Sequence, residues 1–190
     1  MRRALKIAAT IAIGIAFGLA ATWVTAIRGT MSGGVGDGPW STSLDTGSSE
    51  GGFYLRARIA VHGLLALNRE ETIYYSALRD DDGADLVGNC SYRLQGRDPP
   101  TRWWSITAYG ADDFLIPNDA NLYSVSKNSV ARNADGSFVV TLSKVKADGN
   151  WIPVATGRFN LTIRLYNPDH GVIDDPAHVA LPTIIKEPCE

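Results

Sequence analysis

The segment DHGVIDDPAH, residues 169–178, combines two histidines with three aspartates. Imidazole nitrogens and carboxylate oxygens are ligands for divalent metal ions. Their spacing matches no standard zinc motif, and the glycine and proline in the segment are typical of a surface loop. We therefore predict a loop without a metal or a cofactor, and we keep His170, Asp174 and His178 as the alternative ligand set.

A second acidic segment, DDDGAD, covers residues 80–85 and suggests calcium. An EF-hand loop needs oxygen ligands at alternating positions, a glycine at the sixth position and a glutamate at the twelfth. Counted from Asp80, Gly83 comes too early and Ser91 occupies the twelfth position. The Asp-Gly pair is instead typical of a hairpin turn, which is what we predict.

Nucleophilic catalysis needs a serine or cysteine beside a base and an orienting group. The chain has no G-x-S-x-G pattern, and its three histidines lie far from any catalytic motif. We therefore predict no catalytic residues. The sequence favours a protein that is not an enzyme and leaves an enzymatic activity open.

The chain has two cysteines, Cys90 and Cys189. Disulfides persist in proteins that are exported to an oxidising compartment, and the even number permits one bond. Closing so long a loop stabilises the folded state by about 4 to 5 kcal/mol in the chain-entropy model. We predict this disulfide; two separate thiols are the alternative.

Three further side chains are candidates to face a ligand. Trp103 and Trp104 are neighbours in a predicted strand and must point to opposite sides of a sheet, so one packs in the core and the other covers the sheet or contacts a ligand. In RFNLTIRLYNP, residues 158–168, Arg164 falls on the polar side of an alternating pattern. It is a surface residue, a partner for an acid, or a ligand contact.

The amino-terminal segment determines where these residues are located. No charge interrupts residues 7–27, which is long enough for a membrane-spanning helix, and Arg2, Arg3 and Lys6 precede it. Basic residues stay in the cytoplasm, so the rest of the chain is exported. We predict a single-pass inner-membrane anchor over residues 1–28 with the carboxyl-terminal domain in the periplasm; a cleaved signal peptide is the alternative.

Gly14 and Gly18 form a G-x-x-x-G pattern within this helix. The pattern allows two helices to approach closely, so a homodimer is an open alternative. The other explanation is that glycine is simply common in such helices.

A Gly- and Ser-rich tether is predicted over residues 29–52, with Pro39 and Trp40 able to dock onto the domain. The domain itself covers residues 53–190. A helix is expected over residues 53–67, with Phe53, Ala57 and Ala60 on its packing face.

From residue 72 to residue 168 the hydrophobic period changes to that of strands, separated by short turns with Asp-Gly pairs. In the last of these strands Phe159, Leu161, Ile163 and Leu165 share one side. Such a series predicts a mainly β fold, an antiparallel sandwich or barrel.

Several phrases occur in the order seen in one known family: RARIAVHGLLAL, IYYSALRDDDGADLVGNCSYRL, RWWSITAYG, DGSFVV, NWIPVATGRFNLTIRLYNP and LPTI. Over about residues 53–185 the chain resembles the domain of unknown function family 1214 (DUF1214). It is similar to the short, membrane-anchored bacterial members, which lack the domain of family 1254 found in longer ones. The resemblance implies a jelly-roll-like β-sandwich and no established activity.

Charge excludes one class of function, because 18 basic and 20 acidic residues give a net charge of -2. Nucleic-acid binding depends on a surplus of lysine and arginine, so we expect no nucleic-acid partner. The sequence predicts an envelope protein that acts as a non-catalytic binding or assembly module with an envelope protein partner. An envelope enzyme, or enzyme subunit, for a small molecule or carbohydrate is the alternative.

Overall fold

The computed structural model describes residues 2–25, 34–36, 38–43, 45–48, 51–61 and 66–189. Its elements, in chain order, are α1 (Arg2–Trp23), β1 (Trp40–Ser41), α2 (Phe53–Val61), β2 (Thr72–Ala77), β3 (Cys90–Gly96), β4 (Thr101–Gly110), β5 (Ser124–Ser126), β6 (Phe138–Ser143), β7 (Trp151–Pro153), β8 (Phe159–Pro168), α3 (His170–Asp174), the 3-10 helix η2 (Pro176–His178) and β9 (Thr183–Cys189). They divide between two compact units. One contains α1 and α2, and the other contains all of the strands.

The apolar helix α1 has 22 residues and no buried residue. At 1.5 Å per residue it is about 33 Å long, enough to cross the hydrocarbon core of a bilayer. It is the one helix in the described part of the chain with the length and composition of a membrane span, and it lies near the amino terminus. Such a helix is a signal anchor or a signal peptide.

Helix α2 begins at the predicted residue, and residues 62–65 of the predicted helix lie outside the described part of the chain. The expected packing face is wrong. Phe53 is 89% exposed, while Leu55 and Ile59, one turn apart on a different side, are half-buried. Apolar residues occur on both sides of this short helix, so hydrophobic spacing alone did not identify the side that packs.

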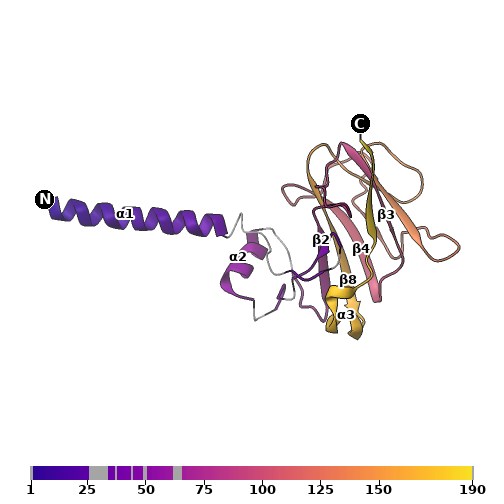
Figure 1. Ribbon diagram of the computed structural model, residues 1–190, viewed down its shortest axis with the longest axis horizontal. Helices are drawn as coiled ribbons and strands as arrows, with labels where there is room; N and C mark the ends of the chain where they lie inside the picture. Colours follow the sequence, from indigo (N-terminus) through magenta and orange to yellow (C-terminus); the bar gives the residue numbers. More distant parts are fainter. Residues whose placement is uncertain are drawn as a thin grey trace. The chain divides into compact units, whose positions relative to one another are not determined.

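The strands form two sheets, shown facing each other in Figure 1. One has five strands in the order β1-β2-β8-β4-β5, with every pair antiparallel. The other has four strands in the order β7-β6-β3-β9, and β6 and β7 run parallel. The protein is therefore mainly β, with two sheets packed as a sandwich.

The alternating side chains of β8 provide much of the core between the sheets. Phe159, Leu161, Ile163 and Leu165 are all buried, as the sequence predicted. Burying a residue of this size stabilises the fold by roughly 1.5 to 3 kcal/mol. They pack in one cluster with residues of the facing sheet, which include Tyr92, Leu94, Phe138, Val140, Leu142 and Ile184.

Part of the predicted tether belongs to the sandwich. Residues 34–43 lie in the same compact unit as the strands, and Trp40 pairs with Ala77 at the edge of β2. The indole of Trp40 is buried, and its Nε1–H donates to the carbonyl of Pro182 at 2.7 Å. The backbone of Gly36 lies so close to Trp40 that a Cβ there would be 2.0 Å from the carbonyl oxygen of Trp40, so this position needs glycine. The expected docking of Trp40 is therefore present.

Candidate functional site

The outward side of the five-stranded sheet is composed almost entirely of hydroxyl and aromatic side chains. Strand register aligns its residues in four rows, which together we name the outer face: Thr72–Tyr166–Trp103, Tyr74–Arg164–Ser105–Ser126, Ser76–Thr162–Thr107–Ser124 and Asn160–Tyr109. Arg164 is the one charged residue in these rows. An isolated bridge continues the last row from Tyr109 to Leu115, which is 45% exposed, and Asn160 donates to Oδ1 of Asp113 at 3.2 Å. The face therefore differs from an ordinary solvated surface, which carries both signs of charge.

Arg164 lies between two tyrosines from the strands on either side of β8. Its Nη2 donates to the hydroxyl of Tyr109 at 2.6 Å, and its Nη1 donates weakly to Oγ1 of Thr107 at 3.4 Å. Its Cζ lies 5.5 Å from the ring centroid of Tyr109 and 6.0 Å from that of Tyr74. Each cation–π contact of this kind contributes about 0.5 to 1 kcal/mol and fixes the guanidinium against the sheet.

Arg164 has no acidic partner among the residues that the structure describes. Within the described part of the chain, no carboxylate forms an ion pair with it. The other outward arginine on a central strand, Arg93 of β3, has Glu187 at 3.5 Å. A half-exposed guanidinium without an acid is available to bind an anion, because it presents several donors in a planar fork.

Trp103 and Tyr166 form an aromatic pair next to Arg164. They are opposite each other in register, and their ring centroids are 5.1 Å apart with a tilt of 58°. Both side chains are partly exposed. Since Tyr166 is two residues from Arg164 on the same strand, the pair lies about 7 Å from the row of Arg164.

Three small hydroxyl residues lie among these larger side chains. Ser105, Thr107 and Thr162 point outward by register and yet are buried, with 6 to 8% of their surface exposed. The taller aromatic and arginine side chains around them account for this shielding. The outer face thus has a base of hydroxyl groups between aromatic rings.

The structure separates the two predicted tryptophans. Trp103 lies on the outer face, but Trp104 is fully buried, stacks on Phe138 at 5.0 Å between centroids, and donates its Nε1–H to Asp98 at 2.9 Å. Trp104 therefore does not face a ligand, because consecutive residues of a strand point to opposite sides. The predicted alternation is confirmed, and Trp104 is removed from the candidate site.

Asp98 is fixed by its contacts with Trp104 and Arg132. Partial burial alone would raise the pKa of Asp98. Hydrogen bonds from Arg132 and Trp104 and the positive charges of Arg132 and Lys127 outweigh this effect, so the pKa of Asp98 lies below its ordinary value. Arg132 donates to this carboxylate at 2.8 Å. Asp98, Trp104 and Arg132 thus form a structural contact group and do not belong to the candidate site.

The candidate metal ligands lie in the segment around α3 and η2, where Figure 1 shows α3 at one end of the sandwich. His170 and Asp174 are exposed, and Nδ1 of His178 contacts Asp175 Oδ1 at 2.8 Å. Among the residues that the structure describes, no group of three His, Cys, Asp or Glu side chains is arranged to hold a metal ion. The segment is a short helix and turn on the surface.

The acidic segment from Asp80 to Asp85 forms a turn, as predicted. Oδ1 of Asp80 accepts the amides of Asp82 and Ala84 at 3.1 and 2.8 Å, and Gly83 has a φ of 82°. Asp81 accepts the amide of Ile184 at 2.8 Å, which ties the turn to β9. Burial and the charges of Asp80 and Asp82 raise the pKa of Asp81, against the lowering effect of that hydrogen bond.

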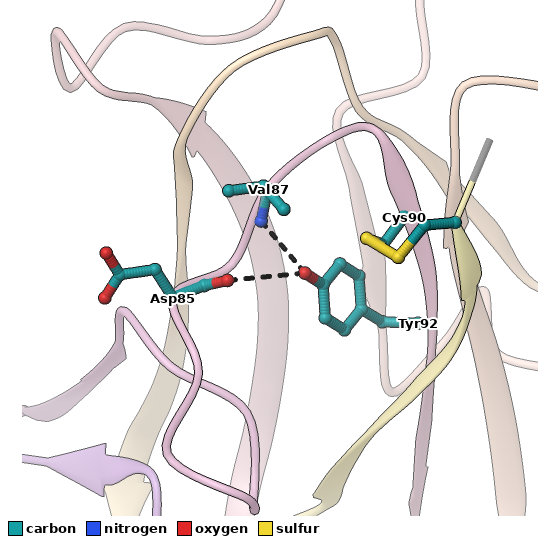
Figure 2. Close-up of a disulfide and its surroundings, with 5 residues drawn as sticks. Asp85, Val87, Cys90 and Tyr92 are labelled. Carbon is teal, nitrogen blue, oxygen red and sulfur yellow. Dashed lines mark hydrogen bonds between the residues drawn. A yellow bond between two sulfur atoms is a disulfide. The ribbon is translucent and has the colours of Figure 1, made fainter.

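Cys90 and Cys189 form a disulfide that joins β3 to the end of β9 (Figure 2). Beside it, the hydroxyl of Tyr92 accepts the amide of Val87 at 2.9 Å and donates to the carbonyl of Asp85 at 3.5 Å (Figure 2). Burial raises the pKa of Tyr92, since the hydrogen bond from Val87 only partly offsets it. This end of the sandwich is held by covalent and polar contacts. The disulfide and the apolar helix together suggest an exported domain.

Comparison with protein families identifies the central series of strands. The model of the family described as a protein of unknown function (DUF1214) matches residues 71–170, from the start of β2 through β8. This is more than half of the chain. The chain belongs to the DUF1214 family. The predicted resemblance is thus confirmed, and the outer face is part of the DUF1214 region.

Two solved structures resemble this DUF1214 chain. The VPA0106 protein from Vibrio parahaemolyticus is 24% identical over 73% of this chain and 36% of its own, with a TM-score of 0.61, which shows a shared fold. An uncharacterized protein from Burkholderia cenocepacia is 20% identical over 62% of this chain and 29% of its own, with a TM-score of 0.42, and we draw nothing from it. This chain spans about a third of the length of each. No curated protein matches it.

Sequence reasoning placed Arg164 and Tyr166 on one outward side and left open which of Trp103 and Trp104 faces outward. It missed Tyr74 and Tyr109 as neighbours of Arg164. Each tyrosine occupies an outward position of an alternating strand, so the signal was present. The sequence did not indicate which strands lie side by side. The cluster exists only because β2 and β4 both pair with β8.

Proposed function

We propose that this DUF1214 chain is a membrane-anchored bacterial envelope protein whose sandwich binds another envelope component without converting it. The outer face is the binding surface. The observation that carries the proposal is its composition: tyrosine, tryptophan and one arginine, with no lysine, glutamate or aspartate. Tryptophan, tyrosine and arginine contribute most to binding energy at recognition surfaces, where lysine, glutamate and aspartate are depleted.

The charges at the amino terminus support the proposed location. Arg2, Arg3 and Lys6 precede the uncharged part of α1, and Arg28 follows it. The larger basic group favours an amino terminus in the cytoplasm and a sandwich in the periplasm, with α1 retained as an anchor. A sandwich held at the membrane in an oxidising compartment is suited to bind components of the envelope.

The order in which the chain visits the two sheets supports a more specific fold class for the sandwich. The chain crosses between the two sheets five times: β1 and β2 lie in the five-stranded sheet, β3 in the four-stranded sheet, β4 and β5 in the first, β6 and β7 in the second, β8 in the first and β9 in the second. Such crossing connections between two packed sheets are typical of jelly rolls, and we infer a jelly-roll-like topology.

The proposal is tested by crosslinking in living cells. A photo-reactive amino acid replaces Ser76 or Ser126 on the outer face, and Gln95, which points outward from the four-stranded sheet, is the control. Reproducible adducts from the two serine positions and none from Gln95 are expected. Equal adducts from all three positions, or none from the serines, would contradict the assignment of the binding surface. Purified chain that converts the captured component would show that the protein is an envelope enzyme instead.

A further inference from the structure

We propose that the ligand of the outer face is a saccharide that bears a carboxylate. Arg164 binds the carboxylate, and the pair of Trp103 and Tyr166 packs against a sugar ring. The inference rests on the proposed function, since it names the class of ligand for that same surface. It is carried by three properties of the face: its charge, its hydroxyl content and the spacing of its groups.

The charge of Arg164 favours an anionic ligand. Arg164 is half-buried, with no acidic partner among the described residues, and the carboxylate of Asp113 contacts the rows at Asn160 rather than at Arg164. Tyr109 and Thr107 occupy two of its five donors, which leaves an edge of the guanidinium for a ligand. Arginine pairs with a carboxylate through two parallel hydrogen bonds, which a point charge does not reproduce.

The hydroxyl groups favour a saccharide over a protein partner. Seven residues of the rows are serine or threonine, and the aliphatic Leu115 lies only at the end of the last row, opposite Tyr109. The outer face shares its tyrosine, tryptophan and arginine with protein–protein interfaces, but the centre of such an interface is depleted in serine, so the serine and threonine content favours a saccharide. Four of these hydroxyl residues are buried, and Ser76, Ser124 and Ser126 are partly exposed. A polyhydroxylated ligand exchanges hydrogen bonds with these three serines and with water, while its C–H bonds pack on the electron-rich faces of aromatic rings.

The distance between Arg164 and the aromatic pair fits a ligand that carries a sugar ring and a carboxylate on one saccharide chain. Arg164 and Tyr166 are alternate residues of β8, so their rows are about 7 Å apart. Trp103 and Ser105 repeat the same spacing on β4, opposite Tyr166 and Arg164. One sugar ring on the aromatic pair therefore places a carboxylate of the same or the next sugar within reach of Arg164.

The test uses the full chain in detergent micelles and defined oligosaccharides. Oligomers of galacturonic, mannuronic and glucuronic acid, and the carboxyl-reduced neutral form of each, are titrated by calorimetry. We expect at least one acidic oligomer to bind roughly tenfold or more tightly than its neutral form, which is the effect of a charge-assisted hydrogen bond. Arg164→Gln removes this preference, and Trp103→Ala weakens binding of both forms.

Two controls separate loss of the contact from loss of the fold. Arg93→Gln removes an outward arginine of the other sheet and is expected to leave all affinities unchanged. Near-ultraviolet circular dichroism of each variant reports that the core is intact. Arg164→Lys keeps the charge but not the planar fork, and is expected to retain only part of the preference.

The other possible results separate the carboxylate, the saccharide class and the binding function itself. Equal affinity for acidic and neutral forms, with Trp103→Ala still weakening both, overturns the carboxylate and leaves the binding function. No binding to any oligomer overturns the ligand class, and crosslinks from Ser76 and Ser126 to a protein would then identify the other class of partner. No binding together with no crosslinks overturns the proposed function as well.

Discussion

Trp40 donates its indole N–H to the carbonyl of Pro182 at 2.7 Å, although 142 residues separate them. Trp40 enters from the glycine-rich segment after α1, and Pro182 directly precedes β9 at the edge of the other sheet. The contact therefore connects the two sheets through a residue that sequence composition assigns to a linker.

Trp40→Ala is expected to destabilise the sandwich by about 3 kcal/mol, the usual cost of deleting a buried tryptophan. The measurement is chemical denaturation of the full chain in detergent, followed by circular dichroism. The control is Ser41→Ala, an exposed neighbour in β1, which is expected to change stability by less than about 0.5 kcal/mol. Equal stability of both variants would mean that the segment does not dock.

The two adjacent tryptophans are expected to respond differently to the same substitution. Trp104→Ala removes a fully buried ring that stacks on Phe138, and a loss of about 3 to 5 kcal/mol follows. Trp103→Ala removes a partly exposed ring and costs about 1 kcal/mol, mainly its contact with Tyr166. Urea unfolding of both variants decides this, and a larger loss for Trp103 would reverse the assigned faces.

The disulfide is expected to be complete in protein isolated from cells. Thiol alkylation of unfolded, non-reduced protein should modify neither Cys90 nor Cys189, and prior reduction should expose both, as mass spectrometry will show. Replacing both cysteines by serine should lower the free energy of unfolding by up to about 4 to 5 kcal/mol, because the bond closes a loop of 99 residues. Modification of both thiols without reduction would show that the bond is absent.

Stability should depend on pH through Asp98. Its pKa in the folded protein is below the ordinary value of 3.8, so the ionised form favours folding at pH values above that value. The contribution is lost as the pH falls through the folded-state pKa. Asp98→Asn should therefore lose about 1 kcal/mol at pH 7, a figure reduced for partial exposure, and should approach the parent below pH 3.8. A difference that grows on acidification would contradict this.

The strands with clear alternation could be predicted from the sequence, and the edges could not. In β8 a buried residue occurs at every second position along most of the strand, which a period of two reveals. In β9 only Ile184 is fully buried, and Lys186, Glu187 and Pro188 follow it, so no period marks the strand. Strand β1 has two residues and exists only through its pairing with β2.

The outer face was predictable residue by residue but not as a cluster. Alternation places Arg164 outward, and it equally places Tyr74 and Tyr109 outward on their own strands. Their meeting depends on the order β2-β8-β4, and Tyr109 and Arg164 are 55 residues apart. Register and strand order arise from packing of the whole sandwich, which local sequence does not encode.

The most direct test of the binding surface is oxidative footprinting of aromatic side chains in intact cells and in purified full chain. If the outer face is occupied in the envelope, oxidation of Trp103 and Tyr166 will be several-fold lower in cells than in purified protein. Tyr123, partly exposed in the segment before β5, will react equally in both. Equal oxidation of Trp103 and Tyr166 in the two samples would show that the face is open to solvent in the cell, and would contradict its assignment as the binding surface.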